Sequence, residues 1–297
     1  MNGSDPPVSG ARMREDLRPA PLAVLTGASS GIGAALAERL ADRGYRLLLI
    51  ARRRLTLEAL ARRYGPERCT IAPFDLARSD QIAPAVRPLL AEHGAAEVLI
   101  NCAGVGLYKT FLEHERDDFL RLMRINFLAA VEMTRCVLPG MLQRGCGTVI
   151  NIASVSSKMG PWGHAGYAAS KAALVSLTQT LAAEHAGSGV HFCYVNPGIV
   201  QTDYFTHEQT RELWPIVRRH ALKVAPTADK IMTLLQRPRL ELCIPRHYRC
   251  LDWIRAVSVD WAHRLVARSS RPARARPVAD SHPILGTAGA RPVVSDR

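Results

Sequence analysis

Short, continuously apolar runs alternate with helical patterns along most of this chain, and this alternation constrains the fold more than any other feature. Strands that are apolar along their whole length are buried on both faces, which is typical of parallel sheets covered by helices. We therefore predict an α/β fold with a doubly wound parallel sheet in a single domain, residues 21–245. The predicted strands are 22–26, 46–51, 69–74, 97–101, 147–153, 190–195 and 240–244, and the main helices are 33–43, 55–64, 117–144 (its end disturbed by Pro139-Gly140) and 166–186.

The regions outside this domain have a different composition. Residues 1–20 and 269–297 are rich in proline, glycine, arginine and serine, which predicts disordered tails. Residues 246–268 place apolar side chains at helical spacing among arginines and predict a basic amphipathic helical extension. Such a helix could lie on an anionic membrane or bind an acidic partner. We favour packing against its own domain or a second subunit over peripheral membrane contact.

Charge and cysteine content exclude several classes of function. The net charge is +13, but only five of the 39 basic residues are lysine. The arginine enrichment is therefore a general property of this sequence and is weak evidence for any particular binding site. Without a recognised nucleic-acid module it does not predict nucleic-acid binding. Seven cysteines form no CxxC pair, which predicts reduced, mostly buried thiols and no metal site. No apolar run approaches the ~20 residues of a membrane span, and the N-terminus lacks a secretion signal, so we expect a cytoplasmic protein.

A glycine-rich turn, Thr26–Gly33, lies between the first predicted strand and the first predicted helix. Missing Cβ atoms and the helix N-terminus allow backbone N–H groups to approach a pyrophosphate, as in a Rossmann fold. The spacing GxxxGxG differs from the usual GxGxxG, and a tight turn that needs glycine is the simpler alternative. Its position after an N-terminal strand favours a nucleotide cofactor. The predicted contacts are Gly27, Ser29, Ser30, Gly31, Ile32 and Gly33.

The end of the second strand bears on which dinucleotide binds. An acidic residue there would bind the adenosine ribose, but this sequence has Ala51-Arg52-Arg53-Arg54. Arginine suits the oxygens of a 2′-phosphate. Arg52 and Arg53 therefore favour NADP(H) over NAD(H), although NAD(H) is not excluded.

Three further motifs follow in order: Asn101-Cys-Ala-Gly104, Ser154, and Tyr167-Ala-Ala-Ser-Lys171. Together with the glycine turn, they resemble the short-chain dehydrogenase/reductase family over about residues 20–245. The serine precedes the tyrosine by thirteen residues, as the family pattern requires. Cys102 departs from the family's second asparagine. The resemblance implies further cofactor contacts at Asp75, Leu76, Asn101, Ala103, Gly104, Tyr167, Lys171, Pro197, Gly198, Val200 and Thr202.

The resemblance also implies a catalytic set. Tyr167 would be the acid/base, Lys171 would lower the tyrosine pKa, and Ser154 would hydrogen-bond the substrate oxygen. Asn126 would hold a water that connects Lys171 to solvent, although it could instead only cap or kink its helix. His164 would line the substrate mouth or face solvent. Ser154 and Tyr167 are thus the predicted substrate contacts.

These residues imply an NADP(H)-dependent oxidoreductase that transfers hydride between nicotinamide and a carbonyl or secondary alcohol. A moderately hydrophobic small-molecule substrate is expected, because the family closes this site with a lid, here about 203–225, that contains Tyr204, Phe205 and Trp214. These side chains could equally only pack the lid onto the sheet. The family commonly forms a homodimer or homotetramer. The alternative is a non-catalytic NADP(H)-binding regulatory or scaffold protein, against which the complete catalytic set speaks.

Overall fold

A seven-stranded, fully parallel sheet organises the protein, in the order β3-β2-β1-β4-β5-β6-β7. The structure is a computed structural model, and it describes residues 20–202 and 218–270. The strands are β1 Leu22–Thr26, β2 Arg46–Ala51, β3 Cys69–Pro73, β4 Val98–Asn101, β5 Gly147–Ile152, β6 Val190–Pro197 and β7 Glu241–Ile244. The chain reverses its direction of winding between β1 and β4, which confirms the predicted doubly wound sheet.

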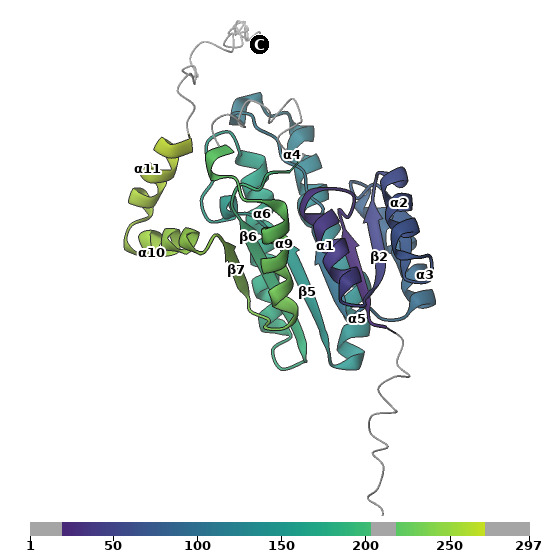
Figure 1. Cartoon of the computed structure of the whole chain (residues 1–297). Coiled ribbons are helices and arrows are strands. Elements are labelled where there is room, and N and C mark those ends of the chain that lie inside the picture. Colours follow the sequence, from purple (N-terminus) through teal and green to yellow (C-terminus); the bar gives the residue numbers. More distant parts are fainter. Residues whose placement is uncertain (1–19, 203–217, 271–297) are drawn as a thin grey trace, which may run out of the picture.

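Helices connect the strands and cover both faces of the sheet (Figure 1). They are α1 Gly31–Asp42, α2 Arg54–Tyr64, α3 Ile82–His93, α4 Arg116–Met123, α5 Ala129–Arg144, α6 Ala165–Glu184, α9 Val224–Met232, α10 Cys250–Val257 and α11 Val259–Ser270. Short 3₁₀ turns occur at Ser79–Gln81, Phe111–Glu113, Val155–Ser157, Arg218–His220, Thr233–Leu235 and Arg246–Arg249.

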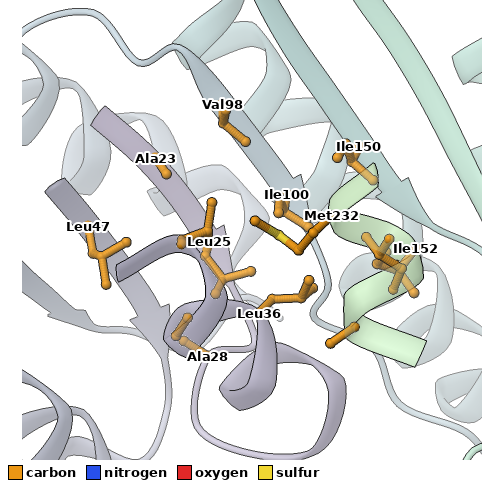
Figure 2. Close-up of a cluster of buried hydrophobic side chains, with 14 of the residues drawn as sticks. Ala23, Leu25, Ala28, Leu36, Leu47, Val98, Ile100, Ile150, Ile152 and Met232 are labelled. Atoms are coloured by element: carbon orange, nitrogen blue, oxygen red, sulfur yellow. The ribbon is translucent and has the colours of Figure 1, made fainter. Parts of the chain in front are cut away.

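Two apolar layers hold the helices to the sheet. On one face, Leu36 of α1 and Met232 of α9 pack against strand residues such as Leu25, Ile100 and Ile152 (Figure 2). On the other face, α3, α5 and α6 cover strand side chains that alternate with the first set, which include Val24, Leu48, Leu99 and Val149. Both layers are fully buried at their centres, as a parallel sheet requires.

The longest helical stretch differs from its prediction. Pro139 lies inside α5, which continues to Arg144, and a π-helical turn, Arg124–Leu128, joins α4 to α5 without a break. The combined helix Arg116–Arg144 is the one described helix whose length and apolar composition would also suit a membrane span. It meets this criterion by its average hydropathy, because Glu132 and Arg135 interrupt its apolar sequence and no continuous apolar run of that length is present in it. Met133 and Met141 are fully buried against the sheet, which explains the apolar composition of this helix.

Two further expectations need correction. Of the seven free cysteines, Cys69, Cys193 and Cys243 are buried, Cys102 and Cys136 are partly buried, and Cys146 and Cys250 are exposed, so the expectation of mostly buried thiols holds only in part. In the extension, Val257, Trp261 and Leu265 are 87%, 71% and 53% exposed, so packing against the domain is wrong for these positions, whereas packing against a second subunit stays a prediction. Most of the predicted tails 1–20 and 269–297, and most of the predicted lid 203–225, lie outside the described residues. Ser269 and Ser270, which were predicted to belong to the C-terminal tail, form the end of α11.

Candidate active site

The carboxyl ends of three central strands meet at one edge of the sheet. Thr26 of β1 is aligned with Asn101 of β4, and Asn101 with Asn151 of β5. The Thr26 hydroxyl oxygen accepts hydrogen bonds of 3.1 Å from the backbone N–H groups of both Cys102 and Ala103. This contact joins the loop after β4 to the loop after β1, where the chain changes its winding direction.

The glycine turn leaves no room for side chains between these loops. Gly27 has φ +72°, and a Cβ atom there would lie 2.8 Å from the Ala103 Cα. A Cβ atom on Gly33 would lie 2.1 Å from the Gly27 carbonyl oxygen. Because α1 begins at Gly31, its first N–H groups lie directly behind this turn. The cradle therefore fits a dinucleotide pyrophosphate, which binds backbone N–H groups at such a helix terminus.

The segment after β6 packs on the same turn. A Cβ atom on Gly31 would lie 2.9 Å from the Thr202 methyl carbon, so the predicted cofactor residues of these two regions are in contact. Pro197 ends β6, and the Gly198 N–H donates to the Ile244 carbonyl at 2.7 Å. Val200 is buried.

The residues predicted to recognise the adenosine half divide into two groups. Arg53 lies over the glycine turn, where its Nε donates to the Ser29 hydroxyl at 3.2 Å and its Nη2 to the Ser29 carbonyl at 3.0 Å. Arg52 is exposed beside it. Asp75 accepts the Ala77 N–H at 3.0 Å, and Leu76 is buried in the core. The arginines are thus close to the cradle and accessible.

Asn101 makes its side-chain hydrogen bonds within the fold. Its side chain is buried, and its Nδ2 donates to the Asn151 Oδ1 at 2.8 Å. Asn151 in turn donates to the Thr178 hydroxyl of α6 at 2.8 Å. The Asn101 side chain therefore ties β4 to β5 and, through Asn151, to α6, and its contact with the cofactor stays a prediction.

Tyr167 lies in the first turn of α6, beside Ser154 at the end of β5. The Ser154 side chain hydrogen-bonds the tyrosine hydroxyl. Burial raises the pKa of Tyr167 above its ordinary value, and the Ser154 hydrogen bond partly offsets this rise. Ser154 itself is buried and also accepts the Ser156 N–H at 3.2 Å. The structure thus brings together the two residues predicted to contact the substrate.

Lys171 follows Tyr167 by one helical turn, and its ammonium is buried. Its Nζ donates to the Ile152 carbonyl at 2.7 Å and lies 6.0 Å from the centroid of the Tyr167 ring. Burial lowers the pKa of Lys171 to about 8, although the nearby Cys102 thiol works in the other direction. Burial also raises the pKa of Cys102 to about 12, so this thiol remains protonated.

Asn126 sits in the π-helical turn between α4 and α5. Its Oδ1 accepts the Val105 N–H at 2.8 Å, and its Nδ2 donates to the Val105 carbonyl at 2.9 Å and the Ser170 hydroxyl at 3.0 Å. The side chain thus fixes the loop after β4 to α6. A Cβ atom on Gly104 would lie 3.2 Å from the Lys171 Nζ and 3.3 Å from the Asn126 Oδ1, so any side chain there would crowd both groups.

Two aromatic residues near Tyr167 were not predicted. The Tyr108 ring centroid lies 5.5 Å from that of Trp162 and 5.2 Å from that of His164, and the His164 ring lies 5.9 Å from that of Tyr167. Burial lowers the pKa of His164, which favours the neutral imidazole. These rings form a wall beside the tyrosine. Trp162 could have been found from its place between Ser154 and Tyr167, whereas the loop that holds Tyr108 has no sequence signal.

Comparison with known proteins gives the same assignment. The family model for short chain dehydrogenase matches residues 21–213. The ketoacyl reductase HetN of Nostoc is 34% identical over 179 residues, which cover 60% of this chain and 62% of HetN. An acetoacetyl-CoA reductase of Allochromatium vinosum is 35% identical over 187 residues, which cover 61% of this chain and 75% of that protein.

Solved structures share the fold. The short-chain dehydrogenase from Sphingobium yanoikuyae in complex with NADPH has a TM-score of 0.70 and 30% identity, and the match covers 86% of this chain and 98% of that one. The family model, the relatives, the cradle and the Ser154–Tyr167–Lys171 group agree. This chain belongs to the short-chain dehydrogenase/reductase family.

Proposed function

We propose that this protein is an NADP(H)-dependent ketoreductase that reduces a moderately hydrophobic carbonyl compound, with Tyr167 as the proton donor. The observation that supports this most directly is the Ser154 hydrogen bond to Tyr167, with the Lys171 ammonium one helical turn away. The names of two relatives, a ketoacyl reductase and an acetoacetyl-CoA reductase, favour a ketone substrate.

The two hydroxyl groups have complementary tasks. When bound, the nicotinamide supplies the hydride that converts a carbonyl carbon to an alcohol carbon. Negative charge then develops on the carbonyl oxygen, and hydrogen-bond donors aimed at that oxygen stabilise it. In this proposal the hydroxyl groups of Ser154 and Tyr167 both face the carbonyl oxygen of the substrate. Because the pKa of Tyr167 is raised by burial, its proton is fully present at neutral pH and available to the oxygen.

Lys171 keeps positive charge near the phenolate that remains after proton donation. Its pKa of about 8 leaves it mostly protonated at neutral pH. The side chain would also hold the nicotinamide ribose, since the adjacent Gly104 gives close access to the loop after β4. The proposal includes a water held by Asn126, which would connect Lys171 to solvent and so allow the donated proton to be replaced.

The preference for NADP(H) rests on Arg52 and Arg53. Arg53 is held over the glycine turn by its two bonds to Ser29, so a guanidinium lies at the cradle. A 2′-phosphate suits this fork, and no acidic residue follows β2 to disfavour it.

The apolar and aromatic wall of Tyr108, Trp162 and His164 supports a substrate with an apolar surface. The test is to incubate the purified full chain with NADPH and a panel of ketones, which includes β-ketoacyl thioesters, and to follow the nicotinamide absorbance. Oxidation of NADPH that requires a ketone and is lost in Tyr167→Phe supports the proposal. NADPH binding without turnover of any ketone would favour the regulatory or scaffold alternative.

A further inference from the structure

Lys158 lies in the loop between Ser154 and Tyr167, and the catalytic scheme above gives it no task. Its side chain is 8% exposed, and its ammonium lies 2.7 Å from the Glu241 Oε1 and 2.5 Å from the Asp252 Oδ2. Burial lowers the pKa of Lys158, but the hydrogen bonds to Asp252 and Glu241 raise it more, so the net shift is upward. A charged ammonium therefore joins this loop to β7 and α10.

A chain of hydrogen bonds continues from this ion pair to the active site. The Glu241 Oε1 also accepts the Asn196 Nδ2 at 3.0 Å, and Asn196 is buried at the end of β6. The Ser157 hydroxyl lies 3.1 Å from the Asn196 Oδ1 and 2.6 Å from the Ser154 carbonyl oxygen, and its single proton is shared between these acceptors. The path therefore ends on the backbone of Ser154.

The extension holds the same loop at two further points. The Arg255 Nη1 of α10 donates to the Lys158 carbonyl at 2.7 Å. At the end of α11, the Ser270 hydroxyl accepts the Trp162 N–H at 3.0 Å. Trp162 belongs to the aromatic wall beside Tyr167. The loop from Ser154 to Tyr167 is thus anchored on its outer side by the C-terminal extension.

We propose that Lys158 is a positioning residue that, through Asp252 of α10, Glu241 and Asn196, fixes Ser154 relative to Tyr167, so that turnover depends on the docked C-terminal extension. A buried ammonium that loses one of two carboxylates lets its loop relax, because the remaining partner alone does not fix both the loop and α10. The catalytic part of this inference rests on the proposed ketoreductase function, and the structural part does not.

The test compares Asp252→Asn with Asp229→Asn in the full chain. Asp229 makes a similar bond to Arg39, at 3.0 Å, but between α9 and α1, away from the Ser154 loop. We expect Asp252→Asn to lower kcat/KM for the ketone by about tenfold, which is within the range of effects of substitutions in a network of contacts away from the ligand. The Kd for NADPH should not change. Asp229→Asn should leave both values unchanged, and Asp252→Glu should restore most of the activity.

A double-mutant cycle tests the route. If Asp252 acts through Lys158, Asp252→Asn should have no further effect on kcat/KM in a Lys158→Gln background. Additive effects would overturn the role of Lys158. Should Lys158→Gln fail to fold, Glu241→Gln replaces it, since this variant removes the next contact on the same path.

Two readouts do not need turnover. Hydrogen–deuterium exchange of peptides within 153–164 should rise in Asp252→Asn and not in Asp229→Asn. The second readout is the pKa of Tyr167, measured as the difference between the ultraviolet titration of each protein and that of its Tyr167→Phe variant. This pKa should rise in Asp252→Asn, because the Ser154 hydrogen bond that lowers the pKa would be weakened. Unchanged exchange, or raised exchange with an unchanged Tyr167 pKa, would overturn the proposal. A wild-type chain that reduces no ketone would refute only the proposed function, and these two readouts would still decide the positioning role.

Discussion

The Lys171 ammonium lies 6.0 Å from the centroid of the Tyr167 ring, and it donates its hydrogen bond to the Ile152 carbonyl. Lys171 is buried and Tyr167 is partly buried, and burial moves the two pKa values in opposite directions: upward for Tyr167 and downward for Lys171. The sequence pattern led us to expect a tyrosine pKa lowered by the lysine. In the structure burial is the larger influence, and the Ser154 hydrogen bond is what opposes it. Tyr167 is therefore protonated at neutral pH, which is the state in which it could donate a proton to a ketone oxygen.

Replacement of Tyr167 by phenylalanine should separate binding from turnover. The Tyr167→Phe variant removes the proton donor and leaves the glycine cradle intact, so turnover should fall by about 100-fold or more, the usual size of acid–base catalysis. The NADPH affinity, measured by fluorescence titration, should change little. Tyr45→Phe is the matched control, because Tyr45 packs at the other end of the sheet against the α1 layer. Retained turnover in Tyr167→Phe would contradict the proposed role.

Burial of the Lys171 ammonium should lower the free energy of unfolding of the protein. The pKa falls from 10.5 to about 8, which corresponds to about 3 kcal/mol against the folded state while the lysine is charged in both states. Below pH 8 this cost is fully present. Between pH 8 and 10.5 the folded state binds fewer protons than the unfolded state at this site, so the cost shrinks as pH rises.

The Lys171→Met variant should therefore be more stable than the wild type at pH 7 and inactive. We expect a gain of about 1–2 kcal/mol, since the lost bond to the Ile152 carbonyl offsets part of the effect. Urea unfolding at pH 7 and pH 10 measures it, and the gain should be smaller at pH 10. Lys230→Met, at an exposed position, is the control and should change stability by less than about 0.5 kcal/mol. If Lys171→Met is less stable than the wild type at pH 7, the contacts of the Lys171 ammonium outweigh the free-energy cost of burying its charge.

The order of strands and helices could be predicted because each element has its own local pattern. Leu22–Thr26 and Arg46–Ala51 were found at their observed bounds from apolar residues alone. Pro139 misled us because a proline normally disturbs a helix. Here Val137 and Met141 on either side of it are buried against the sheet, and this packing overrides the local preference.

The parts of the site that were missed depend on contacts between distant residues. The π-helical turn at Asn126 is held by the backbone of Val105, which no local pattern of residues 117–144 contains. Lys158 donates a hydrogen bond to Asp252, which lies 94 residues away in the sequence. The motif residues Ser154, Tyr167 and Lys171 were found because their spacing is a property of one strand, one loop and one helix.

The glycine cradle can be tested by two glycines of similar backbone conformation. Gly27 and Gly44 have φ angles of +72° and +82°, so alanine is strained at both. A Cβ atom on Gly27 would also meet the Ala103 backbone at 2.8 Å, whereas on Gly44 nothing lies within 4 Å. Each variant should lose about 1 kcal/mol of stability from backbone strain. Only Gly27→Ala should lose NADPH binding by fluorescence titration, and equal binding losses would mean that strain, not close approach, is responsible.

The cofactor preference should depend on the arginines after β2. Arg53 is held at the glycine turn by Ser29, and Arg52 is exposed beside it. The Arg52→Asp variant introduces the carboxylate that would bind a free ribose and repel a 2′-phosphate. It should raise the KM for NADPH by at least about tenfold, the effect of a charge-assisted contact of 1.5–3 kcal/mol, and leave the KM for NADH unchanged or lower. Arg62→Asp makes the same charge change in the last turn of α2, away from the cradle, and should affect neither value. Because both cofactors share the pyrophosphate and the nicotinamide, an equal rise in both KM values would place Arg52 outside the 2′-phosphate site.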